Sequence, residues 1–479
     1  MSRSAWISSS VRRLRRGAAA ALLLTLSVLI LPAAALAESL TVGLYPYVPR
    51  LQQFQDAVTD AWAKVEPTVQ LNFLTTSQWD GGYDMNPPAS ADVFVFDAMF
   101  LNYFRTQGYL ETIAESEISN PSDFLPYALD GVKTASGYSA IPLLGCTNIL
   151  FYQKTDAAVA NADTIDQLDA VLGQCSYTSQ IPPDRRGLMI DMAGGTTNAS
   201  LYLYIEAGIE DKWPVALPQS EADLDPTAVA IQRKMLAMAS YYNGTEDPGS
   251  EYGRANWYSH GWGRATVGFT ESMSAMTEAT RQATDFKLFP ASNNTDAPNL
   301  FYSDVIGINT TTASRGTRDL AVKLAGVMAS SEVVVASIGP GGGSAYPQYL
   351  MPVRTSVFQT LGQTFPKYQD MQTLVNTSNP VLFSLDADAR NWLSSMKNVI
   401  KTEAREDYAC GCDFDAVQSI PDNSAAAPVC QQTCSAHGGW NGQWTNQYPA
   451  SQSGSVCGCN ACPTPVAVDT LVATPRAND

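Results

Sequence analysis

Histidine can contribute little chemistry in this sequence, because His260 and His437 are its only two histidines. A Ser/His/Asp triad or a His-rich metal site therefore has little material, and we expect neither a metal nor a cofactor. Cysteine is the alternative nucleophile. Seven of the nine cysteines lie beyond residue 408, which leaves Cys146 and Cys175 in the preceding body of the chain. A thiol acts as a nucleophile when its pKa is depressed or a base lies beside it, so Cys146 is a candidate.

The pairing of Cys146 has two interpretations. In an exported protein Cys146 and Cys175 could form a disulfide with each other. Alternatively, Cys175 joins the seven C-terminal cysteines in four bridges, and Cys146 is left as an unpaired thiol. Only the second arrangement leaves a nucleophile, and the sequence keeps both open.

Two glycine-containing runs could in principle hold an anion. Gly341 to Gly343 lacks the lysine of a GxxxxGK phosphate loop, so a plain turn is the better interpretation. The run Gly194-Gly195-Thr196-Thr197 precedes a helical segment, where free N–H groups could bind an anion. Helix capping explains this second run equally well.

The elements that must position these residues begin with a strand, a helix and a strand. Residues 39–45 alternate in hydropathy, a helical pattern continues to Val65, and residues 69–74 form a second short strand. This order predicts parallel pairing. The next strand reads DVFVFD from Asp92 to Asp97. In an open α/β sheet this strand places Asp97 at the carboxyl edge, where ligands bind.

A chain of 479 residues is long enough for two lobes, because single cores stop growing at roughly 250 to 300 residues. From about Tyr408 the composition shifts to Gly, Ser, Asn and Pro with clustered cysteines, which favours disulfides over zinc in an exported chain. The predicted organisation is a signal peptide at 1–37, the first lobe at 38–142, the second lobe at 143–290, a return to the first lobe at 291–340, helices closing the body at 341–405, a Cys-rich disulfide module at 406–465 and a disordered tail at 466–479.

The first 37 residues are typical of an export signal. Four arginines between Arg12 and Arg16 precede an apolar run to Ala34, and Ala35-Leu36-Ala37 offers a cleavage site. We expect export to the periplasm or the medium, with no stable membrane insertion of the mature chain, because the run is short of the roughly 20 residues that span a bilayer. Removing five arginines changes the net charge from −17 to −22. Such a surface repels nucleic acid and tolerates a small cation, although acidity could equally serve solubility.

Two motifs resemble those of a known family. Residues 141–152 read IPLLGCTNILFY and resemble the nucleophile region of thiaminase I (thiamine pyridinylase), and residues 268–273, GFTESM, resemble the segment with that family's catalytic glutamate. The likeness extends from Val42 to about Lys401 and leaves out the Cys-rich end. It implies a two-lobed α/β fold of the type II periplasmic-binding-protein kind, with the ligand cleft between the lobes. It also implies a transferase that displaces the thiazole of thiamine by an amine or thiol, through a covalent Cys–pyrimidine intermediate.

Carried over residue by residue, the resemblance makes Cys146 the nucleophile and Glu271 the base that takes its proton. The competing interpretation of Glu271 is a solvated glutamate at the start of a helix, where the helix dipole would lower its pKa. Phe269 is a departure if the family prefers tyrosine there. The substrate-binding residues implied are two carboxylates at the ends of predicted strands, which accept from the aminopyrimidine, and four aromatic walls: Asp97, Asp304, Tyr45, Tyr47, Tyr252 and Tyr302.

Two other functions compete with this interpretation. The fold is used by many solute-binding proteins, so the chain could capture thiamine or another small ligand for a transporter. A binder has no use for a nucleophile and a base, so Cys146 with Glu271 favours the enzyme. The C-terminal module could separately attach the protein to a surface or bind a partner. The body is expected to be a monomer.

Overall fold

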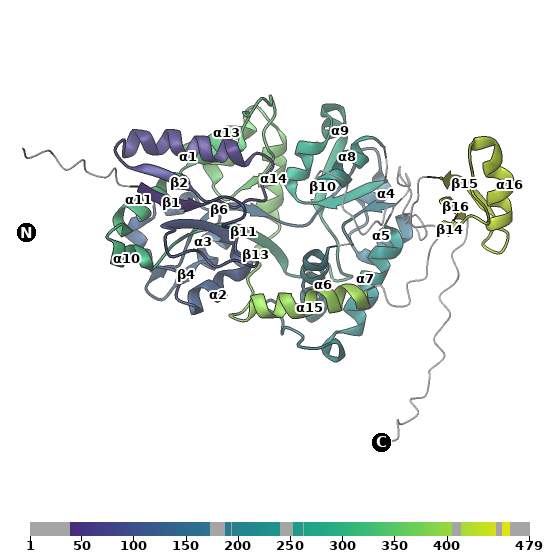
Figure 1. Cartoon of the computed structure of the whole chain (residues 1–479), viewed down its shortest axis with the longest axis horizontal. Helices are drawn as coiled ribbons and strands as arrows, with labels where there is room; N and C mark the ends of the chain where they lie inside the picture. The colour runs from purple at the N-terminus through teal and green to yellow at the C-terminus, as the bar shows by residue number, and fades with distance from the viewer. Residues whose placement is uncertain are drawn as a thin grey trace, which may run out of the picture. The chain divides into compact units, whose positions relative to one another are not determined.

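The computed structural model describes residues 39–172, 187–192, 194–239, 252–261, 263–404, 413–446 and 453–459 (Figure 1). The predicted signal peptide, residues 1–37, and the predicted tail, residues 466–479, lie outside these ranges. Cys175, Cys410, Cys412 and Cys462 also lie outside them, so the predicted four-bridge scheme is described only in part.

The first lobe is built on a mixed sheet of seven strands in the order β12-β6-β11-β3-β1-β2, with β13 added beside β11. The predicted parallel opening is confirmed, because β1 pairs in parallel with both β2 and β3. All five residues of β3 are buried, as expected for a strand covered on both faces. The strands are β1 (Ser39–Gly43), β2 (Gln70–Phe73), β3 (Val93–Asp97), β6 (Ile141–Cys146), β11 (Asn299–Ile308), β12 (Met351–Pro352) and β13 (Pro380–Leu382).

Helices cover this sheet. Helix α1 (Leu51–Val65) buries Phe54, Val58 and Trp62, which share one helical face, and it packs against α11 and α12 (Figure 1). The remaining elements of the lobe are η1 (Ala98–Phe100), α2 (Leu101–Thr106), η2 (Glu115–Glu117), η3 (Pro121–Asp123), α3 (Pro126–Gly131), β4 (Lys133–Thr134), β5 (Gly137–Tyr138), α10 (Thr311–Arg315), α11 (Arg318–Met328), α12 (Ser331–Ile338), α13 (Thr355–Gly362) and α14 (Lys367–Thr377).

The second lobe contains a four-stranded sheet in the order β10-β7-β9-β8. Its strands are β7 (Ile149–Gln153), β8 (Leu188–Met189), β9 (Ala265–Gly268) and β10 (Thr284–Leu288). Its helices are α4 (Ala157–Ala160), α5 (Ile165–Leu172), α6 (Gly195–Glu210), η4 (Glu221–Asp223), α7 (Pro226–Met238), α8 (Gly253–Ser259), η5 (Thr270–Ala275) and α9 (Glu278–Ala283). The two lobes agree with the predicted fold class.

The chain passes between the lobes three times, and the first passage corrects a predicted boundary. The boundary at residue 142 falls inside β6, which pairs with β11 and β12 in the first sheet. The second lobe instead starts with β7, after Thr147 and Asn148. The Thr147 hydroxyl donates to the carbonyl of Leu300 (2.8 Å), which ties the first passage to the start of the returning strand β11.

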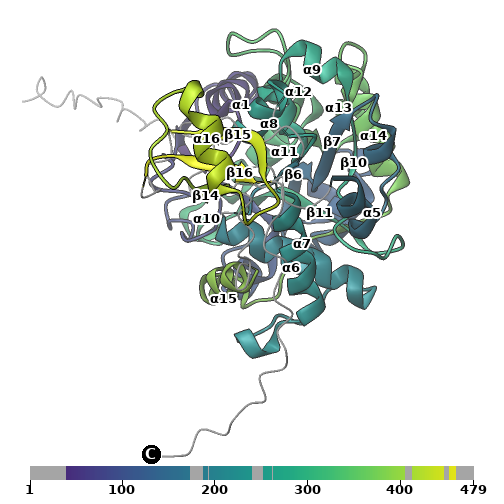
Figure 2. The ribbon, with the colours of Figure 1, turned by 90° about the vertical axis from the view of Figure 1, so that its right-hand side faces the viewer.

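Helix α15 (Ala389–Glu403) forms the third passage. It packs on α6 of the second lobe (Figure 2), and it also contacts η1 and α2 of the first. Trp392, Leu393, Met396 and Ile400 form its buried stripe, at the spacing of one helical face. The indole N–H of Trp392 donates to the carbonyl of Pro218 (2.8 Å), so α15 is fixed along the second lobe.

The Cys-rich module contains β14 (Asp413–Asp415), α16 (Asn423–Thr433), β15 (Trp440–Thr445) and β16 (Val456–Cys459), with the strands in the antiparallel order β14-β16-β15. Two disulfides, Cys430–Cys457 and Cys434–Cys459, join α16 to β16. They lie among the few other buried residues of the module. A small core of this kind depends on covalent links, and the two bonds indicate an oxidising compartment.

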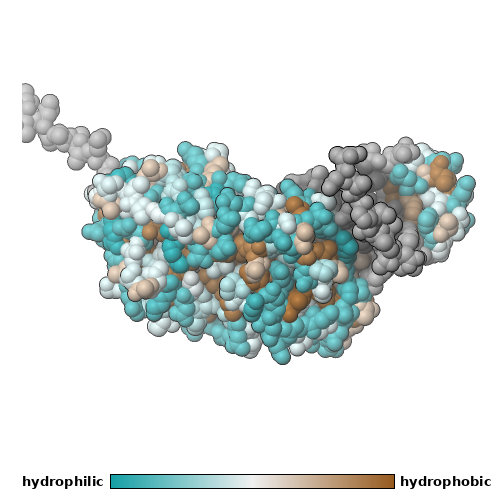
Figure 3. Space-filling model, turned by 90° about the horizontal axis from the view of Figure 1, so that it is seen from below, coloured by the Kyte–Doolittle hydropathy of each residue, from teal (hydrophilic) through white to brown (hydrophobic). Residues whose placement is uncertain are grey.

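The surface of the body is mainly hydrophilic when seen from below, with separate hydrophobic patches (Figure 3). Large exposed hydrophobic side chains are few among the described residues, and three of them, Tyr47, Phe269 and Tyr346, are aromatic. Within the described ranges no single helix is long and apolar enough to cross a membrane. The bent pair Arg318–Met328 and Ser331–Ile338 passes that test only when joined, on length and composition.

Candidate active site

A cavity of about 510 Å³ is lined by residues of both lobes, and all eight predicted site residues line it. Cys146 and Glu271 come from different sheets, since Cys146 ends β6 and Glu271 follows β9. A second cavity, of about 660 Å³, is lined by residues such as Trp213 and Val381 and contains none of the eight. The chemistry predicted from the sequence therefore converges on one place.

Cys146 is a free, partly buried thiol at the last position of β6. It faces Tyr302 across the antiparallel ladder with β11. The residue before it must be small, because a Cβ on Gly145 would lie 2.3 Å from the Tyr127 hydroxyl oxygen. Burial raises the pKa of Cys146 well above its ordinary value, and the charges of Glu271 and Asp304 add to the effect. The thiol is therefore protonated at neutral pH and needs a base.

Glu271 is buried in the short helix η5, where it is 6% exposed. This excludes the solvated glutamate considered from the sequence. The tight passage from β9 into η5 needs a glycine at position 268, because a Cβ there would lie 2.4 Å from the Ser272 hydroxyl. The carboxylate of Glu271 is close enough to Cys146 to raise the pKa of the thiol. Glu271 thus lies within electrostatic range of the proton that it would have to accept.

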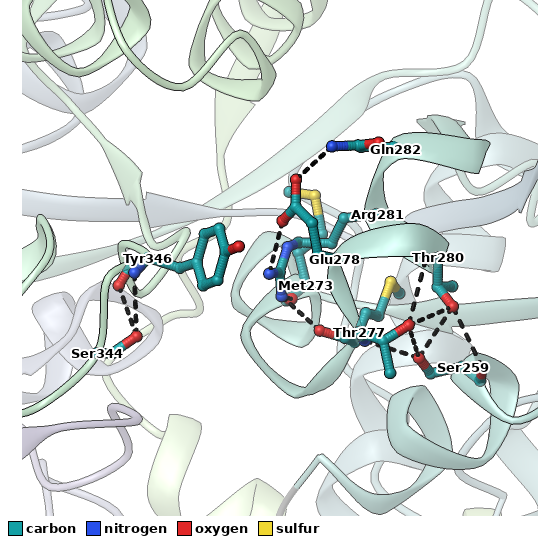
Figure 4. A network of polar contacts seen from close by, with 10 residues as sticks. Ser259, Met273, Thr277, Glu278, Thr280, Arg281, Gln282, Ser344 and Tyr346 are labelled. Atoms are coloured by element: carbon teal, nitrogen blue, oxygen red, sulfur yellow. Dashed lines mark hydrogen bonds and ion pairs between the residues drawn. The ribbon is translucent and has the colours of Figure 1, made fainter.

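Arg281 holds η5 in place through its guanidinium (Figure 4). Its guanidinium, in a residue that is 5% exposed, donates from Nη1 to the carbonyls of Met273 (3.1 Å) and Met276, and from Nη2 to Glu278 (2.9 Å). The ring of Tyr346, from the first lobe, lies over this guanidinium with its centroid 4.3 Å from Cζ. A residue of one lobe thus contacts the arginine that fixes the Glu271 segment of the other.

Asp97 and Asp304 are direct neighbours across the antiparallel pair β3 and β11. Asp97 ends β3 as predicted, but the prediction that Asp304 ends a strand is wrong. Asp304 lies inside the ten-residue strand β11, where the pairing with β6 shifts between Asp304 and Val305. Such a bulge re-aims side chains locally. Burial raises the pKa of Asp97 to about 6, and burial followed by the charge of Asp97 raises the pKa of Asp304 well above its ordinary value.

Tyrosines connect these carboxylates to one wall of the cavity. The Tyr83 hydroxyl donates to Asp97 Oδ2 (3.1 Å) and lies 3.3 Å from the Tyr45 hydroxyl. The Tyr47 ring contacts both Tyr45 and Tyr83 edge to face, with centroids 5.4 and 5.7 Å apart. Tyr83 was missed in the sequence, because its segment Asp80-Gly81-Gly82-Tyr83 has the composition of an ordinary turn.

Tyr302 and its neighbours form a further aromatic part of the cavity lining. The Tyr302 ring lies 4.7 Å from Phe383 and 5.9 Å from Phe269, between centroids. Phe269 is 36% exposed at the cavity, and Tyr252 lines the cavity from the residue before α8. The cavity therefore combines aromatic side chains with buried carboxylates, which suits a flat cationic heteroaromatic ligand.

Comparisons with known sequences agree with this geometry. A family model described as the Thiaminase-1 domain matches residues 147–292, and a model described as mannan-binding protein matches residues 423–459. Thiaminase-1 of Paenibacillus thiaminolyticus is 39% identical over 374 residues, which are 76% of this chain and 87% of that protein.

Solved structures give the same result. Clostridium botulinum thiaminase I in complex with thiamin is 34% identical with a TM-score of 0.70, covering 76% of this chain and all of that one. Thiaminase I from Bacillus thiaminolyticus is 38% identical with a TM-score of 0.70, covering 76% and 99%. A solute-binding protein of an ABC transporter from Thermotoga lettingae, 14% identical with a TM-score of 0.53 over 77% and 94%, shares the fold. The chain belongs to the thiaminase I family of thiamine-degrading enzymes.

Proposed function

We propose that this enzyme transfers the pyrimidinylmethyl group of thiamine to an amine or thiol acceptor through a covalent adduct on Cys146. The observation that carries the proposal is the free thiol of Cys146, which shares one cavity and an electrostatic coupling with the buried Glu271. Neither a metal nor a cofactor is needed for this reaction. Histidine is not needed either, because a carboxylate at hydrogen-bonding distance can accept the thiol proton.

The proposed reaction has two halves. Glu271 accepts the Cys146 proton, and the thiolate forms a C–S bond to the aminopyrimidine ring. The C–N bond between the methylene and the thiazolium nitrogen then breaks, and its electron pair leaves with the neutral thiazole. Glu271 then releases the Cys146 proton to solvent. In the second half an amine or thiol adds to the methylene carbon and gives its proton to Glu271. The C–S bond breaks, and the thiolate of Cys146 returns and takes this proton back from Glu271.

Binding and charge support this assignment of roles. Asp97 and Asp304 present acceptors to the amino group of the pyrimidine, and Tyr45, Tyr47 and Tyr302 enclose the ring. The permanent positive charge of thiamine balances the buried carboxylates and favours the thiolate of Cys146, because an opposite charge at close range stabilises the ionised form of a group. The bound substrate thus removes part of the electrostatic barrier that keeps the resting thiol protonated.

The test is intact-protein mass after incubation with thiamine and no added acceptor. We expect the wild type to gain one pyrimidinylmethyl group and to lose it again when an amine is added, whereas Cys146→Ser gains nothing. Glu271→Gln should turn over ~10² to 10⁴ times more slowly, and Glu221→Gln, an exposed glutamate of the same lobe, serves as control. If the wild type binds thiamine intact without a mass change, a solute-binding role replaces this mechanism.

Export of a monomer is part of the same proposal. The N-terminal 37 residues carry an export signal in the sequence, and the two disulfides suit an oxidising compartment. The signal routes the chain to the periplasm or the medium. Size-exclusion chromatography with light scattering of the secreted chain, with N-terminal sequencing, tests both the monomer and the cleavage after residue 37.

A second function is proposed for the C-terminal module on a separate observation. Its residues 423–459 match the mannan-binding family model, which favours a carbohydrate-binding role over the alternatives left open by the cysteine pattern. Mannan would then hold the enzyme at a glycan surface. A pull-down on mannan beads of the full chain, compared with the chain ending at residue 404, tests this. Equal retention of both proteins would contradict the proposal.

A further inference from the structure

Cationic side chains line the cavity near the start of α6. Arg254 of α8 and Lys397 of α15 line it together with Thr196 and Thr197 at the start of α6. A third cation, Arg390, also lines the cavity but is engaged by the carbonyl of Tyr83 (2.9 Å) and by Asn86. Cations inside a cavity are notable in a chain with a net charge of −17, because a solute charged like the protein surface is otherwise repelled. The same cavity thus presents both buried carboxylates and cations to a ligand.

Arg254 and Lys397 keep capacity to bind a ligand. Lys397 is partly buried and forms no ion pair with any described residue, and a Cβ on Gly195 would lie 3.4 Å from its Cγ. The side chain of Arg254 is 13% exposed and its Nη2 lies 3.3 Å from Asp191 Oδ1. Its Nε is buried and has no acceptor among the described residues. Asp191 therefore pairs with Nη2 of the Arg254 guanidinium and leaves Nε available to a ligand.

The start of α6 adds backbone donors. Asp191 caps the helix, accepting the Gly194 N–H at Oδ1 (3.1 Å) and the Thr197 hydroxyl at Oδ2 (3.2 Å). No described residue accepts from the backbone N–H groups of Gly195, Thr196 or Thr197, which are the first three of the helix. Asp191 thus fixes the start of the helix, and the three N–H groups of this glycine-threonine run are compatible with a bound anion.

The spacing links this end of the cavity to the reacting group. Thr196 and Ser200 both line the cavity and are one turn, about 6 Å, apart on α6. The Ser200 hydroxyl interacts with Tyr302, which in turn faces Cys146 across the ladder. The contacts through Tyr302 and Ser200 therefore connect Cys146 to the start of α6, and the hydroxyethyl arm of a thiazole bound beside Cys146 can extend along this line to the cations.

We infer that Arg254, Lys397 and the N-terminus of α6 bind a phosphate monoester on the departing thiazole, so that thiamine monophosphate is a substrate alongside thiamine. This inference rests on the proposed function and specifies its substrate class. An anionic group on the acceptor would bind to the same cations. The phosphate is favoured because the hydroxyethyl arm holds it at a distance from the methylene carbon, as the helical turn between Ser200 and Thr196 requires, whereas the acceptor must approach that carbon itself.

The test compares thiamine with thiamine monophosphate, using neutral pyridine as the acceptor so that only the departing group carries the added charge. We expect the wild type to cleave the monophosphate with a kcat/KM at least equal to that for thiamine. In Lys397→Gln and in Arg254→Gln the ratio of the two kcat/KM values should fall about tenfold, as expected for a lost charged hydrogen bond. Lys154→Gln, which removes an exposed charge outside the cavity lining, should leave the ratio unchanged.

The outcomes separate this inference from the proposed function. If the wild type cleaves thiamine but discriminates strongly against the monophosphate, or if neither substitution changes the ratio, the phosphate subsite is wrong while the transferase stands. If the ratio changes only when the acceptor carries an anionic group, the cations serve the acceptor and the inference is overturned. If thiamine itself is not cleaved, the proposed function fails first.

Discussion

Replacing Asp97 with asparagine should make the protein more stable at neutral and alkaline pH while impairing catalysis. Asp97 is 7% exposed. Its Oδ1 accepts the Met99 N–H (2.9 Å) and its Oδ2 accepts the Tyr83 hydroxyl (3.1 Å). Both hydrogen bonds favour the carboxylate, yet burial outweighs them and raises the pKa from 3.8 to about 6. Asparagine has nearly the same shape, can keep the bond from Met99, and carries no charge to desolvate.

The magnitude and its sign follow from the linkage between protons and folding. A rise from 3.8 to about 6, at 1.36 kcal/mol per pKa unit, corresponds to ~3 kcal/mol. Because the pKa is higher in the folded protein, ionised Asp97 lowers stability. This cost is complete above about pH 6 and absent below about pH 4, where the group is protonated in both states. The free energy of unfolding of Asp97→Asn should therefore exceed that of the wild type by ~3 kcal/mol at about pH 8 and match it near pH 4.

The assay is urea denaturation followed by tryptophan fluorescence at several pH values between about 4 and 8, with thiamine turnover measured in parallel. Asp84→Asn is the matched control, because Asp84 lines the same cavity but is exposed. A stability difference that does not change with pH would refute the reasoning. So would an Asp97→Asn variant that is less stable than the wild type at about pH 8, since the hydrogen bonds of the carboxylate would then outweigh its desolvation.

Three further substitutions test other parts of the structure. Gly145→Ala places a Cβ 2.3 Å from the Tyr127 hydroxyl, and thermal denaturation should show a loss of ~1 to 3 kcal/mol; unchanged stability would mean that Tyr127 moves freely. Arg281→Lys keeps the charge but loses the fork that holds η5, so kcat should fall about tenfold or more with little change in KM, measured by steady-state kinetics. Cys430→Ser breaks the bond to Cys457 and should destabilise the module by ~2 to 4 kcal/mol, abolishing retention on mannan beads while thiamine turnover continues.

The sequence predicts those parts of the fold that depend on the local pattern of residue types. The run DVFVFD is apolar between two carboxylates, so it predicts both the burial of the strand and the residue at which the strand ends. Asp97 is therefore placed correctly at the carboxyl end of β3. The opening strand, helix and strand are equally local, and their parallel pairing follows from the order of the elements. Cys146 stands out through composition, because a chain with only two histidines offers little material for a nucleophile activated by histidine. Its free state could not be predicted, because the sequence allowed a bridge to Cys175.

Long-range pairing explains the errors and omissions. The predicted lobe boundary divides β6, because a continuous apolar run gives no sign that its first half pairs with β11 and its second half leads to another sheet. The bulge at Asp304 exists only relative to β6, so the sequence of β11 alone cannot show it. Arg281 is recognised as the support of η5 only when its contacts to Met273 and Met276 are visible.

The carboxylates around Cys146 favour a substrate whose reacting ring is cationic. Asp97, Asp304 and Glu271 each disfavour ionisation of Cys146, so the resting protein opposes ionisation of the thiol that we propose as the nucleophile. A neutral ligand would leave this penalty in place. A thiazolium adds a positive charge inside the cavity, lowers the cost of all four ionised groups together, and carries that charge only until the C–N bond breaks. After cleavage the neutral thiazole has no such partner, so the charge pattern that favours thiamine also favours release of its fragment.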